Sequence, residues 1–204
     1  LAGNRQSFAL LKADVQRDQE HLEFLEMIDS DIERISSITH QMYQLYRPGP
    51  RHRVCFTIEK AIADVVVLLE PILHQAKVTI DLQFSDSPTQ VTLPEGEVKQ
   101  ILLNLIRNAI QASDAGQAVV IRVVSTRKRV RVVVLDHGHG ISEQAMPSIF
   151  DPFYSTKSGP SKQGMGLGLS VSRSLIEAMG GAIEVESRLG EGSEFVAVFQ
   201  RDSK

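Results

Sequence analysis

Three glycines at alternate positions mark the segment of this chain whose backbone is best suited to hold an anion. Gly164, Gly166 and Gly168 lead into a helical pattern that continues to Met179. Glycine leaves backbone amides uncovered, and the first turn of a helix favours negative charge, so the segment is suited to cradle phosphates. No strand precedes it and no Gly-Lys-Ser/Thr follows, which excludes a dinucleotide-binding fingerprint and a P-loop. The polar stretch 155–163 before it is typical of a lid.

Two asparagines four positions apart supply neutral oxygen atoms within an otherwise apolar helical pattern. Asn104 and Asn108 fall on the same side of the helix that we expect over residues 95–112. Amide oxygens suit a hard cation such as Mg2+, which also takes water and phosphate oxygens as ligands. Taken alone, the pair is explained more simply as two amides on a helix surface.

A carboxylate followed by glycines ends one of the expected strands. Asp136 directly follows an apolar strand pattern, and Gly138 and Gly140 come next. The glycines let a flat ligand approach the backbone, and the carboxylate can accept a hydrogen bond from an exocyclic amine. On this segment alone, a turn capped by the aspartate is the simpler explanation. His137 and His139, with no cysteine or third histidine nearby, are a poor ligand set for zinc.

A segment rich in aromatic residues leads into the polar stretch. Phe150 and Phe153 flank an Asp-Pro pair, and hydroxyl side chains and Lys157 follow. The rings are suited to anchor a loop at one end while the ammonium group of Lys157 reaches an anion. The simpler alternative is a surface loop fixed by its two phenylalanines.

Residues 1–47 have a helical pattern of a different kind. After Gly3 they contain neither glycine nor proline, and apolar residues recur at spacings of three and four from Leu25 to Tyr46. Such a heptad seam is typical of a coiled coil or helical bundle, so we expect a helical hairpin. Two copies would form a four-helix bundle, which predicts a homodimer. The alternative is that the hairpin packs against the second domain of its own chain.

A Pro-Gly-Pro segment at residues 48–50 ends this pattern, because proline cannot continue a helix. We therefore expect a helical-hairpin domain, truncated at its N-terminus, over residues 1–47 and a second domain over residues 48–204. In the second domain we expect a helix after Thr57 to about residue 75, further helices over 95–112 and 166–179, and strands over 77–84, 118–125, 130–135, 182–187 and 194–199. Since hairpins dominate these strands, we expect an α+β sandwich with helices covering one face of a mixed sheet.

The composition excludes several classes of protein. The net charge is −3, with 25 acidic against 22 basic residues, which does not favour a nucleic-acid partner. The single cysteine, Cys55, cannot form an internal disulfide and is expected to be a small core residue. No apolar run approaches the roughly 20 residues of a membrane span, and no signal peptide is visible. We expect no membrane segment and a cytoplasmic location, including the cytoplasmic part of a membrane-anchored sensor.

In their order and spacing, these segments resemble the sequence boxes of the Bergerat-fold ATPases, and within that group those of the bacterial sensor histidine kinases. The matching segments are 104–109 for the asparagine box, 136–140 for the first glycine box, 150–153 for the phenylalanine box, 164–169 for the second glycine box and 190–195 for the terminal Gly-x-Gly-Ser/Thr-x-Phe turn. The hairpin at residues 1–47 is similar to the family's dimerisation and histidine-phosphotransfer domain.

The resemblance implies a kinase core that transfers the γ-phosphate of ATP to a histidine and thence to an aspartate on a response-regulator receiver domain. It implies that Asn108 holds Mg2+ between the phosphates, with Asn104 assisting nearby. It also implies that Asp136 binds the adenine amine, and that Gly138 and Gly140 form the floor of the purine slot.

The same resemblance implies a phosphate site at the second glycine box. The backbone there would cradle the phosphates, and the residues concerned are Gly164, Gly166, Leu167, Gly168 and Leu169. Lys157 would approach the terminal phosphates from the lid. Ser193 would lie near the phosphates or support the sheet.

The sequence departs from the family pattern in three places. His137 replaces the usual asparagine of Asp-Asn-Gly, and Gln111 stands where many relatives carry a charged residue. The phosphoacceptor motif His-Glu-x-x-Asn-Pro-Leu is absent, and His21 and His40 read as ordinary helix residues. Because Leu1-Ala2-Gly3 resembles the residues that follow Asn-Pro, we expect the phosphoacceptor histidine just upstream of Leu1. The catalytic residues are therefore unknown from this chain.

Two other functions remain open at this point. One is a non-catalytic, ATP-sensing dimer scaffold, or pseudokinase, although the presence of Asn108, Asp136 and Lys157 argues against a degenerate site. The other is a Bergerat-fold serine kinase of the anti-sigma type, which the long N-terminal hairpin disfavours.

Overall fold

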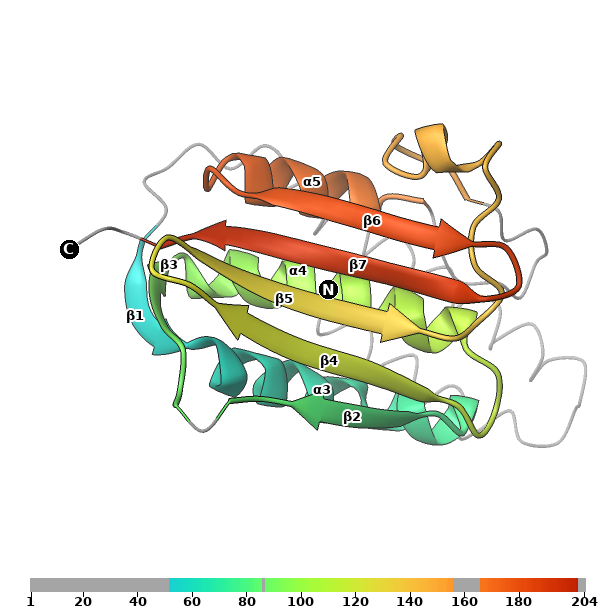
Figure 1. Cartoon of the computed structure of the whole chain (residues 1–204), viewed down its shortest axis with the longest axis horizontal. Coiled ribbons are helices and arrows are strands. Elements are labelled where there is room, and N and C mark those ends of the chain that lie inside the picture. The colour runs from blue at the N-terminus through green and yellow to red at the C-terminus, as the bar shows by residue number, and fades with distance from the viewer. Residues whose placement is uncertain (1–51, 86, 156–165, 202–204) are drawn as a thin grey trace, which may run out of the picture. The chain divides into compact units, whose positions relative to one another are not determined.

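A mixed sheet of five strands forms the framework of the second domain (Figure 1). The computed structural model describes residues 52–85, 87–155 and 166–201. The sheet order is β2 (Thr79–Gln83), β4 (Ala118–Ser125), β5 (Arg129–Asp136), β7 (Gly192–Gln200) and β6 (Ala182–Arg188). β2 pairs with β4 in parallel and the other neighbours are antiparallel. The two hairpins predicted from the sequence, β4–β5 and β6–β7, are both confirmed.

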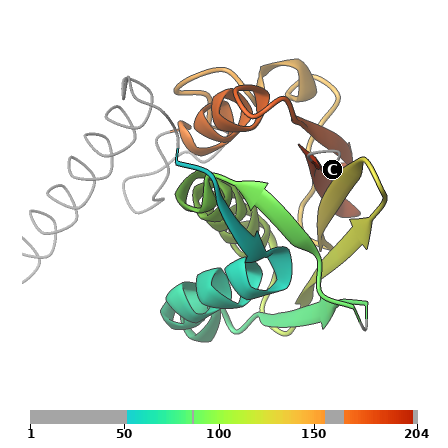
Figure 2. The ribbon, with the colours of Figure 1, turned by 90° about the vertical axis from the view of Figure 1, so that its left-hand side faces the viewer.

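Helices cover one face of this sheet, as predicted. They are α3 (Ile58–Ala76), α4 (Glu95–Ala112) and α5 (Gly168–Glu177), and a short 3-10 turn, η1 (Met146–Ser148), precedes α5. Figure 2 shows the three α-helices on the same side of the strands. Among the residues that the structure describes, no helix is both long and apolar enough to cross a membrane.

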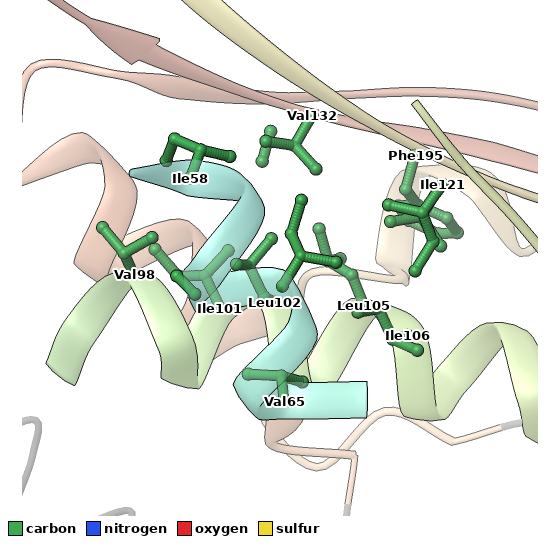
Figure 3. Packing of buried hydrophobic residues seen from close by; sticks show 14 of the residues in the cluster. Ile58, Val65, Val98, Ile101, Leu102, Leu105, Ile106, Ile121, Val132 and Phe195 are labelled. Atoms are coloured by element: carbon green, nitrogen blue, oxygen red, sulfur yellow. The ribbon is translucent and has the colours of Figure 1, made fainter. Parts of the chain in front are cut away.

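The core lies between the helices and the sheet, and α4 is at its centre (Figure 3). Five apolar residues at helical spacing in α4 are fully buried, namely Val98, Ile101, Leu102, Leu105 and Ile106. They pack with sheet residues such as Ile121, Val132 and Phe195. The 3.6-residue period therefore identified both the helix and the face that it buries.

Replacing a core leucine of α4 should destabilise the domain far more than replacing an exposed leucine of α3. Leu105 is 0% exposed, whereas Leu68 is 68% exposed. We expect Leu105→Ala to lower the free energy of unfolding by about 2–5 kcal/mol, because it leaves a cavity. Leu68→Ala should change it by less than about 0.5 kcal/mol. Urea unfolding of both variants tests this, and equal destabilisation would contradict the assigned core.

A two-stranded antiparallel ribbon was not predicted. It pairs β1 (Val54–Thr57) with β3 (Gln90–Leu93). The expectation that Cys55 is a core residue is wrong, because Cys55 is exposed. Cys55 lies opposite Thr92, which is exposed too, and the next pair along the ribbon, Phe56 and Val91, lies on the other face.

Element ends differ from the sequence predictions in smaller ways. Thr57 is the N-cap residue of α3 as expected, but its side chain makes no capping bond, and the backbone N–H of Ile58 donates instead to the Thr89 carbonyl at 3.0 Å. β2 is an edge strand in which Leu82 is 41% exposed, so its alternation is only partly a core pattern. The hairpin predicted over residues 1–47 and the boundary after it lie outside the described residues.

Candidate functional site

The two asparagines of α4 have different environments. Asn104 is 0% exposed, and its Nδ2 donates hydrogen bonds to the Gly168 carbonyl at 3.1 Å and to Ser172 Oγ at 3.0 Å. Asn108 lies one turn later and is half-buried. The alternative of two surface amides is therefore wrong for Asn104, which connects α4 to the first turn of α5.

Asn108 is the asparagine whose amide is open to a ligand. Within residues 52–85, 87–155 and 166–201, no hydrogen bond to its side chain is found, although the residue is half-buried. The same residues contain no group of three or more His, Cys, Asp or Glu side chains that could hold a metal ion. A cation bound at Asn108 would therefore take most of its coordinating oxygen atoms from water and from the phosphates of a bound molecule, which is how Mg2+ is commonly held.

A buried carboxylate ends β5. Asp136 is 2% exposed, and its Oδ1 accepts a hydrogen bond of 3.0 Å from the Gly138 backbone N–H. Burial raises the pKa of this carboxyl, and backbone hydrogen bonds from Gly138 and Ser193, together with nearby His139 and His137, act in the opposite direction. The simpler alternative, a turn capped by the aspartate, is present, and it fixes the carboxylate in the fold.

The glycines after Asp136 let the loop pass close to other backbone segments. A Cβ on Gly138 would collide with the Ala112 carbonyl at the end of α4, and one on Gly140, where φ is +65°, would collide with the Arg188 carbonyl. The His139 N–H donates to the Ala112 carbonyl at 3.2 Å. Both glycines are thus required by protein packing in addition to any approach of a ligand.

The start of α5 has the properties expected of an anion-binding turn. Its N-cap residue, Leu167, provides no side-chain cap, and no acidic residue lies in the first turn. Gly166 has φ of +65°, and a Cβ there would collide with the Tyr154 carbonyl. Within the described part of the chain, no side chain therefore caps or neutralises the backbone N–H groups of this turn. Gly164 and Lys157, the other predicted phosphate contacts, lie outside the described residues.

Arg107 is a candidate site residue that sequence reasoning missed. Its Nη2 lies 3.8 Å from where a Cβ on Gly168 would be, so its guanidinium adjoins the start of α5. Burial lowers its pKa, and no carboxylate in the described part of the chain forms an ion pair with it. The available signal was a cation directly before Asn108, between the apolar pairs Leu105–Ile106 and Ala109–Ile110, which are buried.

The aromatic segment is anchored differently from the prediction. Phe150 packs against the core as expected, and Arg173 lies over its ring at 5.4 Å. Phe153 is 73% exposed with φ of 67°, so it is not an anchor; Tyr154 packs against the core instead. The left-handed backbone turns the Phe153 side chain outward while its N–H donates to the Gly166 carbonyl at 3.0 Å.

Ser193 lies in the sheet beside Asp136. It is 5% exposed, and its hydroxyl is 2.9 Å from Ser187 Oγ. Asp136 and Ser193 are register partners in β5 and β7. Of the two roles expected for Ser193, support of the sheet is the one that these contacts favour.

A family model for histidine kinase-, DNA gyrase B- and HSP90-like ATPases matches residues 94–203, which is more than half of the chain. The chain belongs to this ATPase family. The sensor protein DegM of Bacillus sp. (strain B21-2) is 28% identical over 195 residues, covering 94% of this chain and 50% of that protein. The sensor histidine kinase AruS of Pseudomonas aeruginosa is 35% identical over 159 residues, covering 72% of this chain and 16% of that protein.

Solved structures of histidine kinases are also similar. The nucleotide-free catalytic domain of ThkA has a TM-score of 0.64 and 28% identity, covering 73% of this chain and 95% of that one. Full-length ShkA in complex with AMPPNP has a TM-score of 0.75 and 28% identity, covering 91% of this chain and 40% of that one. ThkA in complex with the response regulator TrrA has a TM-score of 0.73 and 25% identity, covering 96% of this chain and 57% of that one.

These matches define what the chain contains. The chain contains the ATP-binding catalytic domain of a sensor histidine kinase, and the family model matches residues 94–203 of that domain. Every site residue described above lies within that range, from α4 to β7. The chain spans about half the length of DegM and 40% of Sporulation kinase C of Bacillus subtilis (strain 168), so it matches only a part of each.

Proposed function

We propose that this ATPase domain binds ATP with Mg2+ and phosphorylates a histidine of a dimeric helical hairpin. The observation that carries the proposal is the position of α4. Its second half carries Arg107, which adjoins the start of α5, and next to it Asn108, and its last residue, Ala112, packs against the loop that follows Asp136. One helix therefore connects a buried carboxylate suited to an amine with a cationic, uncapped turn suited to phosphates.

Different residues of the site bind different parts of the nucleotide. The Asp136 carboxylate accepts a hydrogen bond from the adenine amine. Arg107 and the backbone from Gly166 to Leu169 face the phosphates, and Lys157 closes on them from the lid. The open amide of Asn108 fits Mg2+, whose role when bound is to neutralise phosphate charge.

In the transfer step, a histidine nitrogen attacks the γ-phosphorus of ATP. The N–P bond forms while the bond from the γ-phosphorus to the β–γ bridging oxygen breaks, and ADP leaves. The imidazole proton passes to a base that we expect beside the phosphoacceptor histidine. The phosphoryl group then moves to an aspartate on a response-regulator receiver domain; the ThkA–TrrA complex supports this class of partner.

The proposal extends to the rest of the protein. Residues 1–47 form the dimerisation hairpin, and two copies complete a four-helix bundle. ATP and a receiver domain are available in the cytoplasm, so we place the reaction there.

Labelling of the full-length protein with ATP carrying radioactive γ-phosphate tests the function. We expect an acid-labile, base-stable phosphoprotein. Asn108→Ala should reduce labelling by about tenfold or more, because a bond to a charged group is worth roughly 1.5–3 kcal/mol. Gln90→Ala, which removes an exposed amide, is the control. ATP binding without any label would favour the scaffold function, and an acid-stable label would favour a serine kinase.

A further inference from the structure

The side chain of Asn104 has its hydrogen-bonding capacity largely used within the protein. Nδ2 donates to the Gly168 carbonyl at 3.1 Å and to Ser172 Oγ at 3.0 Å, and Oδ1 faces Gln100 Nε2 at 3.4 Å. An asparagine amide has two N–H donors, so both are engaged. With an exposed fraction of 0%, Asn104 offers no donor and no surface to a nucleotide.

The partners of Asn104 form a closed group at the start of α5. Ser172 is also 0% exposed, and its hydroxyl donates to the same Gly168 carbonyl at 2.8 Å. Gly168 is the first residue of α5, so its carbonyl accepts from one side chain on α4 and one on α5. Each of these buried polar atoms would lose a partner if the group were broken, which is costly in a dry interior.

We infer that Asn104 is a positioning residue, which fixes the first turn of α5 against α4 and does not contact the nucleotide. A Cβ on Gly168 would lie 3.6 Å from Asn104 Cγ and 3.8 Å from Arg107 Nη2, so the turn lies against the α4 face that carries both residues. The Asn104–Gly168–Ser172 group thereby sets the phosphate-facing amides relative to Arg107 and Asn108. This inference rests on the proposed function, and it differs from the direct role near the phosphates that the family resemblance implies.

The consequence is selective for the phosphate end of the nucleotide. In the proposed function, adenine binding depends on Asp136, the last residue of β5, and the loop after it lies against the end of α4. The Asn104–Gly168–Ser172 group, in contrast, holds only the start of α5. Loss of the group should therefore lower the affinity for ATP and ADP and leave the affinity for adenosine almost unchanged. If the group only contributed to general folding, its loss would lower the affinity for all three ligands together.

The test is a double-mutant cycle on the full-length protein, with affinities for adenosine, ADP and ATP measured by calorimetry. Asn104→Leu and Ser172→Ala should each lower the affinity for ATP and ADP by roughly tenfold, and the affinity for adenosine by less than about twofold. The double variant should lose no more than the worse single variant. Ser174→Ala is the matched control, because its hydroxyl makes the same kind of bond, to the Ser170 carbonyl at 3.1 Å, at an exposed position.

Each other outcome contradicts the inference. Asn104 contacts the ligand directly if Asn104→Leu lowers the affinity for ATP while Ser172→Ala does not, or if the effects of the two substitutions add. If the affinity for adenosine falls as much as the affinity for ATP, the group has only a structural role. Should Asn104→Leu fail to fold by circular dichroism, Ser172→Ala, which removes only one hydroxyl, decides alone. A wild type that does not bind ATP would refute the proposed function, which is a separate and visible result.

Discussion

Asp136→Asn is expected to lower the affinity for ATP by about ten- to a hundredfold without lowering the free energy of unfolding. The carboxyl is 2% exposed, and burial raises its pKa above the value of a free aspartate. Because the pKa of Asp136 is higher in the folded state than in the unfolded state, the protonated carboxyl stabilises the fold at a pH below the unfolded-state pKa. This stabilisation is lost as the pH rises through the folded-state pKa. At neutral pH the charged group is thus a cost to the fold, and a neutral amide of the same shape removes that cost.

The loss of affinity has a different cause. The amide Oδ1 can still accept from the Gly138 N–H, which is 3.0 Å from Asp136 Oδ1 in the wild type. Its NH2 group, however, would then face the adenine amine, so two donors meet where the carboxylate supplied an acceptor. An unmatched buried donor costs about 1–3 kcal/mol, which corresponds to the expected range of affinity.

The pH dependence of binding distinguishes this explanation from a loss of shape. In the wild type, affinity for ATP should fall as acidification protonates Asp136, and this should occur at a higher pH than for an ordinary aspartate because of the raised pKa. The Asp136→Asn variant should lack that step. Calorimetry across pH and urea unfolding measure the two effects, with Asp114→Asn at an exposed position as control. Wild-type affinity in Asp136→Asn would refute the adenine contact.

The parts of the fold that could be predicted are those in which local period and burial agree. The helix predicted over 95–112 is α4 with the same ends, because one apolar stripe runs along its whole length. The β4–β5 hairpin was equally clear from its valine-rich strands. β1 and β3 were missed because each has four residues and their pairing joins segments more than thirty residues apart. A pattern read along the chain contains no signal for such a contact.

The site was predictable as a set of segments but not as a set of contacts. Asn104 and Asn108 look equivalent on a helix, and the difference between them comes from Gly168, which lies 64 positions further along the chain. Arg107 was given no role from the sequence, because its neighbour at the start of α5 is not visible there. Phe153 was misplaced because a left-handed backbone at a non-glycine residue has no sequence signature.

Gly138→Ala should destabilise this domain strongly and weaken ATP binding, although it adds only one methyl group. The new Cβ would collide with the Ala112 carbonyl, and a backbone carbonyl cannot rotate away as a side chain does. We expect the free energy of unfolding to fall by about 1–3 kcal/mol or more, as for other overpacked sites. ATP affinity should fall at least about tenfold, because the Gly138 N–H also holds Asp136 Oδ1.

Gly96→Ala is the matched control, because it adds the same methyl group where no heavy atom lies within 4 Å. Gly96 is in the first turn of α4, so alanine there should stabilise the helix by about 0.5–1 kcal/mol. The two substitutions should therefore change stability in opposite directions and only Gly138→Ala should weaken ATP binding. Equal stability of the two variants would mean that the loop can move away from α4 without cost. In that case the end of α4 would not hold the adenine end of the site, and α4 could not link the two ends of the nucleotide as proposed.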